Sequence, residues 1–117
     1  MLKFVCFFVD ARGDNPVKEF IRQLSLKERA KVMAYCMELK KQGHNLHRPM
    51  ADYLGNGIYE LRPRANRIFY FFFLKNRAIL LHAIRKKTDK IPVHDLALCM
   101  KRKQQVEALG NIEKIDL

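Results

Sequence analysis

The chain has 117 residues, which is the size of one domain with a hydrophobic core of its own and too short for two domains. Its hydrophobic fraction of 49% is ordinary for a globular protein, and no apolar run approaches the roughly 18 residues of a membrane helix. The formal net charge of +11 predicts a polyanionic partner, with nucleic acid first, an acidic protein second, and a merely soluble basic protein as the plain alternative.

Residues 3–9 form an apolar run without alternation, which predicts a strand covered on both faces. Asn15 before Pro16 is typical of a helix start. Ser25 and Glu28 fit a capping box for a second helix, which we expect to end at Gly43. Two helices with almost no linker predict an antiparallel hairpin against a sheet. The inward face of the second helix is expected to carry small and flexible apolar side chains: Ala30, Met33, Ala34 and Met37.

Residues 44–54 are irregular and predict a solvated loop. The pair His44 and His47 has the spacing of metal ligands but no cysteine or acidic cluster beside it, so we favour a plain loop and expect no metal and no cofactor. Arg48 and His47 are candidates for RNA contacts.

Residues 57–87 are expected to form three consecutive antiparallel strands, opened by a Gly-Asn-Gly turn. The stretch 67–74 is rich in aromatic residues, and the stretch 78–84 is apolar. Basic residues stand at the strand ends, on an element that must otherwise be buried.

A last helix is expected to start at Pro92 and end at Gly110, with its apolar face near the start and the part beyond Met100 projecting into solvent. The last seven residues, 111–117, predict a loose tail. The whole chain, 1–117, is therefore expected to be a single α+β domain. In it the first strand and the two-helix hairpin pack on an antiparallel sheet with a three-strand meander, and a C-terminal helix follows.

The meander carries residue types suited to RNA cleavage without metal. Such a site must take a proton from the ribose 2′-hydroxyl, stabilise charge on the phosphate and protonate the leaving oxygen. Arg62 and Arg67 flank one turn, where their guanidinium groups can converge on a phosphate. By the two-residue period of a strand His82 shares a face with Lys86, so that His82 is a candidate proton carrier and Lys86 a phosphate ligand or proton donor.

Each of these residues also has a structural interpretation. Arg62 with Glu60 would be a surface ion pair. His82 would be a hydrogen-bonded core histidine, and Tyr70 is expected in the core. The run 85–87 would be a solvated strand end.

The order of these blocks resembles the RelE/ParE toxin superfamily, and within it the phage-derived Gp49-like branch that contains HigB toxins. The resemblance covers about residues 15–103. It rests on the blocks Tyr59-Glu60-Leu61-Arg62, Arg67-Ile68-Phe69-Tyr70-Phe71, Leu80-Leu81-His82, and Lys86-Lys87-Thr88 followed by Lys90 and Pro92.

The resemblance implies a small α/β toxin that cuts messenger RNA on the translating ribosome and is neutralised by a HigA-like antitoxin, in some cases in a higher-order complex. It favours Arg62, Arg67 and Lys86 as catalytic residues, with His82 beside them, and leaves the general base open. Further RNA contacts are expected from basic side chains around the site: His47, Arg48, Arg64, Arg85 and Lys87. Many relatives have an aromatic residue where this chain has Asn66, which argues against base stacking at that point.

Two other functions remain open at this stage. A ParE-like toxin on the same scaffold would poison DNA gyrase without nuclease residues, and a non-catalytic basic module would bind nucleic acid through charge alone. Cys6, Cys36 and Cys99 show no paired spacing and predict buried thiols in a reducing compartment, so we expect a cytoplasmic protein.

Overall fold

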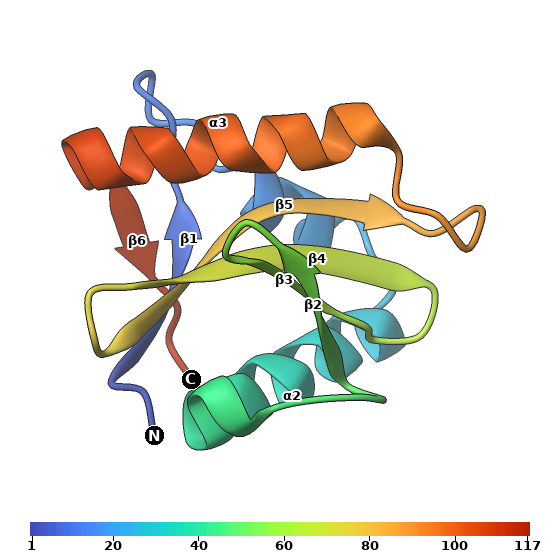
Figure 1. Ribbon diagram of the computed structural model, residues 1–117. Helices are drawn as coiled ribbons and strands as arrows, with labels where there is room; N and C mark the ends of the chain where they lie inside the picture. The colour runs from blue at the N-terminus through green and yellow to red at the C-terminus, as the bar shows by residue number, and fades with distance from the viewer.

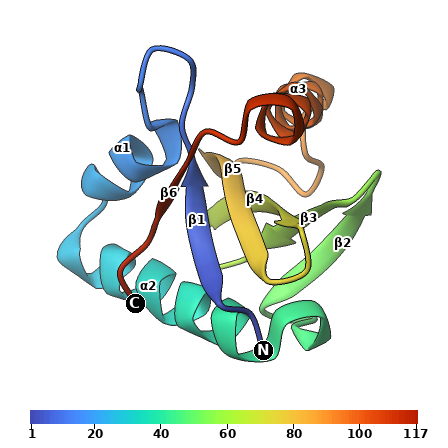
Figure 2. The same cartoon turned by 90° about the vertical axis from the view of Figure 1, so that its left-hand side faces the viewer.

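The computed structural model describes residues 1–117 as three layers, with a sheet between two helices on one face and one helix on the other (Figures 1 and 2). The strands are β1 (Phe4–Phe8), β2 (Ala51–Gly55), β3 (Ile58–Leu61), β4 (Asn66–Phe73), β5 (Arg77–Arg85) and β6 (Ile112–Lys114). The helices are α1 (Pro16–Arg22), α2 (Leu26–Gln42) and α3 (Val93–Leu109), with a short 3-10 helix, η1, at Gly43–Asn45. The expected α+β class is confirmed.

The sheet order is β2-β3-β4-β5-β1-β6, and β1 runs parallel to β5 while the other neighbours are antiparallel. The sheet is therefore mixed, with an antiparallel meander at one side and the N-terminal strand inserted beside its last strand. As predicted, β1 is covered on both faces. Val5 and Phe7 belong to the core under α1 and α2, and Cys6 and Phe8 belong to the core under α3.

Both predicted helix starts are present. The side chain of Asn15 accepts a hydrogen bond from the Lys18 amide at 3.1 Å, and the Ser25 hydroxyl accepts one from the Glu28 amide at 3.2 Å. Each bond satisfies one of the amide groups that a helix leaves unpaired in its first turn. Gly43 closes α2 with a φ of +55°, a backbone conformation that glycine adopts without strain.

The prediction of a loop over residues 44–54 is wrong in its second half, because residues 51–55 form β2. This strand pairs with β3, and the turn Gly55-Asn56-Gly57, in which all three residues have positive φ, connects the two. The meander thus has four strands. The strand escaped sequence analysis because it is a short edge strand whose composition, ADYLG, shows no clear alternation.

The inward stripe predicted for α2 is also wrong. The buried residues are Val32, Cys36 and Leu39, whereas Met37 is 56% exposed. Both sets have helical spacing, so periodicity alone does not separate them. The set with the branched side chains of Val32 and Leu39 faces the sheet, where it packs with residues of β1 and β5.

The C-terminal part of the chain is more closely packed than the sequence predicted. Beyond Met100, α3 stays on the sheet, because Val106 is buried and Arg102 Nη1 donates to the Leu81 carbonyl oxygen at 2.8 Å. The expected loose tail contains β6, which pairs with β1. None of the helices combines the length and apolarity that crossing a membrane requires.

A bulge between β4 and β5 sets which side chains reach α3. Phe69 lies opposite His82 and Tyr70 lies opposite Leu80, so Leu81 has no partner in the register. Leu81 packs in the α3-side core, and His82 bonds to a residue of α3. Two successive side chains therefore point to the same face, which strict alternation along a strand would forbid.

Candidate functional site

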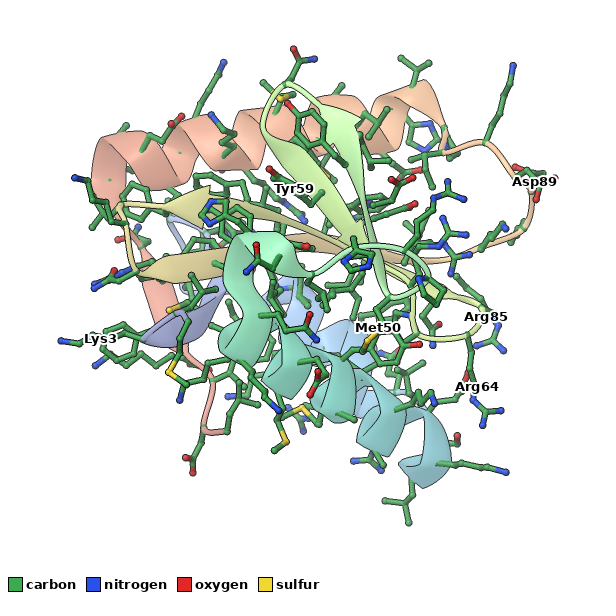
Figure 3. The ribbon with its side chains drawn as sticks, turned by 60° about the horizontal axis from the view of Figure 1, so that its bottom comes forward. Lys3, Met50, Tyr59, Arg64, Arg85 and Asp89 are labelled. Carbon is green, nitrogen blue, oxygen red and sulfur yellow. The ribbon has the colours of Figure 1, made fainter.

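Polar side chains gather where β3, β4 and β5 end beside the loop that leads to α3. A hollow of about 230 Å³ opens there, and we call it the polar hollow. Its lining consists of four cationic side chains, two carboxylates and one apolar residue: Arg48, Arg62, Arg67, Lys86, Glu60, Asp89 and Ile91. Figure 3 shows Asp89, Arg85 and Arg64 along this edge of the molecule, with Lys3 at the opposite edge.

The strand register explains why these residues meet. Glu60 lies opposite Phe69, which lies opposite His82, and Arg67 lies opposite Ile84. Directly opposed residues of antiparallel strands point to the same face, here the face that α3 covers. Because α3 begins only at Val93, a loop and not a helix borders the sheet at this end (Figure 1).

Glu60 is the centre of the polar hollow. Its Oε2 accepts a hydrogen bond from Arg62 Nη1 at 2.9 Å, and its Oε1 lies 3.9 Å from Arg67 Nε. The Glu60 side chain is only 4% exposed, so the surface ion pair considered from the sequence is a buried one. Oε1 is buried and has no hydrogen-bond partner.

Arg67 lies beneath the hollow and is 6% exposed. Its Nη1 donates to the carbonyl oxygens of Arg64 at 2.7 Å and Asn66 at 2.8 Å, which holds the turn between β3 and β4. Burial lowers the pKa of the Arg67 guanidinium, and the neighbouring charge of Arg62 lowers it further. A buried arginine with fixed backbone partners supplies positive charge and rigidity to the floor of the hollow.

Arg62 and Lys86 are the cations of the hollow that a ligand can reach from solvent. Their side chains are 24% and 28% exposed, and they come from different elements, one after β3 and the other after β5. Lys86 Nζ lies 3.2 Å from the fully exposed Asp89 carboxylate, and the Lys86 amide donates to the Ala65 carbonyl at 2.6 Å. Two cations that come from different elements and border the same hollow are suited to binding an anion between them.

Arg48 stands at the rim and bonds to Asp52 at 2.8 Å. The hydrogen bond from Arg48 lowers the pKa of the Asp52 carboxyl and raises that of the arginine. A second space of about 380 Å³, the loop hollow, shares Lys86 and Ile91 with the first. It is lined by strand-end, loop and helix-start residues: Ile84, Arg85, Lys86, Lys87, Thr88, Lys90, Ile91, Pro92, His94 and Asp95.

His82 lies outside both linings. Its Nε2 is 2.7 Å from Asp95 Oδ1 at the start of α3, and its ring stacks on Phe69 with centroids 5.8 Å apart. Burial lowers the pKa of His82, with Asp95 acting in the opposite direction through its hydrogen bond. The hydrogen bond from its ring to Asp95 ties α3 to β5.

The other predicted RNA contacts are dispersed. Arg85 is exposed and pairs with Glu28 of α2 at 2.9 Å, while Lys87 lines the loop hollow. Arg64 and His47 are exposed but line neither hollow. Tyr70 is in the core under α2, as expected, and burial raises the pKa of its hydroxyl.

Asn66 is buried at the start of β4, so its side chain is not offered to a base. No group of three or more histidine, cysteine or acidic side chains is arranged to hold a metal ion.

Comparison with known families assigns the chain to a family. The model of the family described as "Phage derived protein Gp49-like (DUF891)" matches residues 19–104, which is well over half of the chain. This chain belongs to the Gp49-like family. The matched range of this Gp49-like protein includes every lining residue of both hollows, and membership is consistent with a toxin of a toxin–antitoxin pair. No curated protein matches the chain.

Sequence reasoning missed Asp89 and Asp95 as contributors to the site, and it placed the Glu60–Arg62 pair at the surface. Asp89 stands three residues after Lys86, a spacing that is informative only once the loop conformation is known. Asp95 meets His82 across 13 residues, and Glu60 becomes buried between two arginines. The last two depend on how β3, β5 and α3 pack, and no local pattern signals them.

Proposed function

We propose that this Gp49-like protein is a HigB-type toxin that cuts messenger RNA on the translating ribosome, without a metal ion. The observation that carries the proposal is the polar hollow, where Arg62 and Lys86 reach toward solvent from two elements above a buried Arg67–Glu60 pair. The net charge of +11 and the membership in the Gp49-like family support a nucleic-acid substrate and a toxin role.

In the proposed complex the scissile phosphate sits between Arg62 and Lys86. Cleavage places additional negative charge on the phosphate oxygens, and preorganised cations in a partly buried site stabilise that charge more effectively than solvent does. Lys86 can also deliver a proton to the leaving oxygen. Arg67 adds positive charge beneath the phosphate, and Arg48 contacts the RNA at the rim of the polar hollow.

For His82 the geometry supports positioning more than the proton-carrying role predicted from the sequence. Its ring is held between Asp95 and Phe69 and lines neither hollow. By joining β5 to α3, it places the start of α3 and the loop from Lys86 to Pro92. The loop hollow, with its lysines and Arg85, is suited to phosphates on either side of the cut or to ribosomal RNA.

A cognate antitoxin of the HigA type would be the protein partner, and binding over the polar hollow would block the site. Acidic side chains would suit this surface. A messenger RNA substrate would place the protein in the cytoplasm, where buried free thiols such as Cys36 also persist.

The test is induced expression in a bacterium, followed by mapping of messenger RNA 5′ ends with and without translation. The wild type should arrest growth and create new ends on translated messages only. Arg62→Ala and Lys86→Ala should each reduce cleavage by about 100-fold or more, as for removal of an electrostatic stabiliser. Lys3→Ala is the matched control, because Lys3 lies at the opposite edge (Figure 3).

Full toxicity in both hollow variants would refute this site. Growth arrest with intact messages would point instead to a gyrase poison. Salt-dependent RNA binding without arrest or cleavage would point to a non-catalytic basic module.

A further inference from the structure

One carboxylate in the polar hollow has unused hydrogen-bonding capacity. Glu60 Oε1 is buried without a hydrogen-bond partner, and the nearby Arg67 Nε, at 3.9 Å, is too distant to donate. Nearly all buried polar atoms in folded proteins have a partner, so an unpaired oxygen beside a hollow calls for a ligand that donates a hydrogen bond. A phosphate offers no such donor, whereas a hydroxyl group does.

Arg62 links this carboxylate to the place where a phosphate would bind. One end of its guanidinium, Nη1, donates to Glu60 Oε2 at 2.9 Å. A guanidinium has five N–H groups, so the others are free to hold a phosphate. A phosphate bound to Arg62 would therefore be separated from Glu60 by a single guanidinium group, which is close enough for the ribose hydroxyl next to that phosphate to reach the carboxylate.

We propose that Glu60 accepts the proton of the ribose 2′-hydroxyl, and so selects RNA over DNA. This inference rests on the proposed function and assigns the general base that the family resemblance left open. Because the Glu60 side chain is only 4% exposed, the ribose hydroxyl reaches the unpaired Oε1 when the Arg62 side chain shifts toward the phosphate.

In the proposed cleavage step, the 2′-hydroxyl proton passes to the Glu60 carboxylate as the bond from O2′ to phosphorus forms. The bond from phosphorus to the 5′-oxygen breaks, and the departing oxygen takes a proton from the Lys86 ammonium. The products are a 2′,3′-cyclic phosphate and a 5′-hydroxyl, after which Glu60 loses its proton to solvent and Lys86 regains one.

Charged groups on several elements surround Glu60. Arg62 follows it just after the end of β3, Asp52 stands opposite it on β2, and Arg67 lies on β4. The remaining charged neighbours line the hollow from the loops: Arg48, Lys86 and Asp89.

The experiment compares single-turnover cleavage of a translated message by the wild type, Glu60→Gln and Glu60→Asp, with 3′ ends analysed for cyclic phosphate. Glu60→Gln should lose about 100-fold or more, the usual contribution of a general base. Glu19→Gln, which removes the partner of Arg22 on α1 and lies outside both hollows, is the matched control and should cut like the wild type.

Glu60→Asp keeps a carboxylate beside the arginines but withdraws it by one methylene, so it should cut at a reduced rate that still exceeds that of Glu60→Gln. If Glu60→Gln does not fold, cleavage by Glu60→Asp at the wild-type rate would overturn the role of Glu60. Wild-type cleavage with Glu60→Gln within threefold would overturn the role of Glu60 alone. Absence of cleavage by the wild type would overturn the proposed function and this inference together.

Discussion

At the scale of single residues, two buried polar pairs carry the chemistry and the support of the site. The Glu60–Arg67 pair lies under the polar hollow, and the His82–Asp95 pair lies under the start of α3. Breaking a buried charged pair from one side leaves the other charge without compensation, which costs about 3–5 kcal/mol. Substitutions at Arg67 therefore change stability and activity together, whereas substitutions at Arg62 and Lys86, whose side chains are about a quarter exposed, report on function.

The state of His82 predicts how stability depends on pH. Because burial lowers the pKa of His82 in the folded protein, the unfolded chain binds the proton first as pH falls below about 6.5. The contribution of His82 to the free energy of unfolding is therefore fully present above about pH 6.5, and it is lost as the pH falls toward the pKa of His82 in the folded state. We expect the free energy of unfolding, measured with urea at pH 7.5, 6.5 and 5.5, to decrease across this series.

His82→Gln should flatten the decrease, because glutamine keeps a donor for Asp95 and does not titrate. His47→Gln is the control, since His47 is exposed in the segment before β2. An unchanged pH slope in His82→Gln would show that other groups cause the decrease.

At the scale of elements, each helix docks through a face that periodicity alone did not identify. In α2 two stripes have helical spacing, and the one containing Val32, Cys36 and Leu39 packs on the sheet. In α3 the anchors include polar groups: Asp95 binds His82, and Arg102 donates to the Leu81 carbonyl oxygen. Docking of α3 thus depends on hydrogen bonds to β5 as well as on apolar burial.

The choice of stripe in α2 is directly testable. Leu39→Ala should lower the free energy of unfolding by about 2–5 kcal/mol, because it removes a fully buried side chain. Met37→Ala should change it by no more than about 0.5 kcal/mol, because this side chain is largely exposed. Equal decreases in the free energy of unfolding for the two variants, measured with urea, would contradict the assignment of Leu39 to the buried face of α2.

At the scale of the whole molecule, charge is distributed unevenly around the fold. The polar hollow and the loop hollow lie side by side and share Lys86, so cationic side chains line a continuous stretch from β3 to the start of α3. Lysines such as Lys3 at the opposite edge add to the net charge without joining this stretch. The attraction of a polyanion therefore comes partly from the net charge of the whole protein and partly from the cations that line the two hollows.

Salt dependence separates the two parts. Binding of a single-stranded RNA oligonucleotide should weaken as salt rises, because each neutralised phosphate contributes about −0.7 to the slope of log K against log salt. Lys86→Gln should make that slope shallower by about 0.7, measured by fluorescence anisotropy at several salt concentrations. Lys3→Gln should leave it unchanged, and equal effects of the two substitutions would mean that binding is diffuse.

The sequence by itself determined the class of the fold, the two capped helices, the buried first strand and the cationic strand ends. These features follow from local causes: cap chemistry, an apolar run without alternation, and side-chain charge. Arg62, Arg67 and Lys86 were recognisable as candidates because they belong to blocks in a characteristic order.

Only the tertiary structure decided which of these residues meet a ligand and which support the others. The Glu60–Arg62 pair was expected at the surface, but Glu60 is buried and lies at the centre of the polar hollow. The bulge at Leu81 places His82 on the face where it contacts Asp95. Strand β2, the true stripe of α2 and the docking of β6 on β1 likewise depend on neighbours far away in the chain. Burial and register are properties of packed elements, and a sequence pattern constrains them only where one face of an element is clearly apolar.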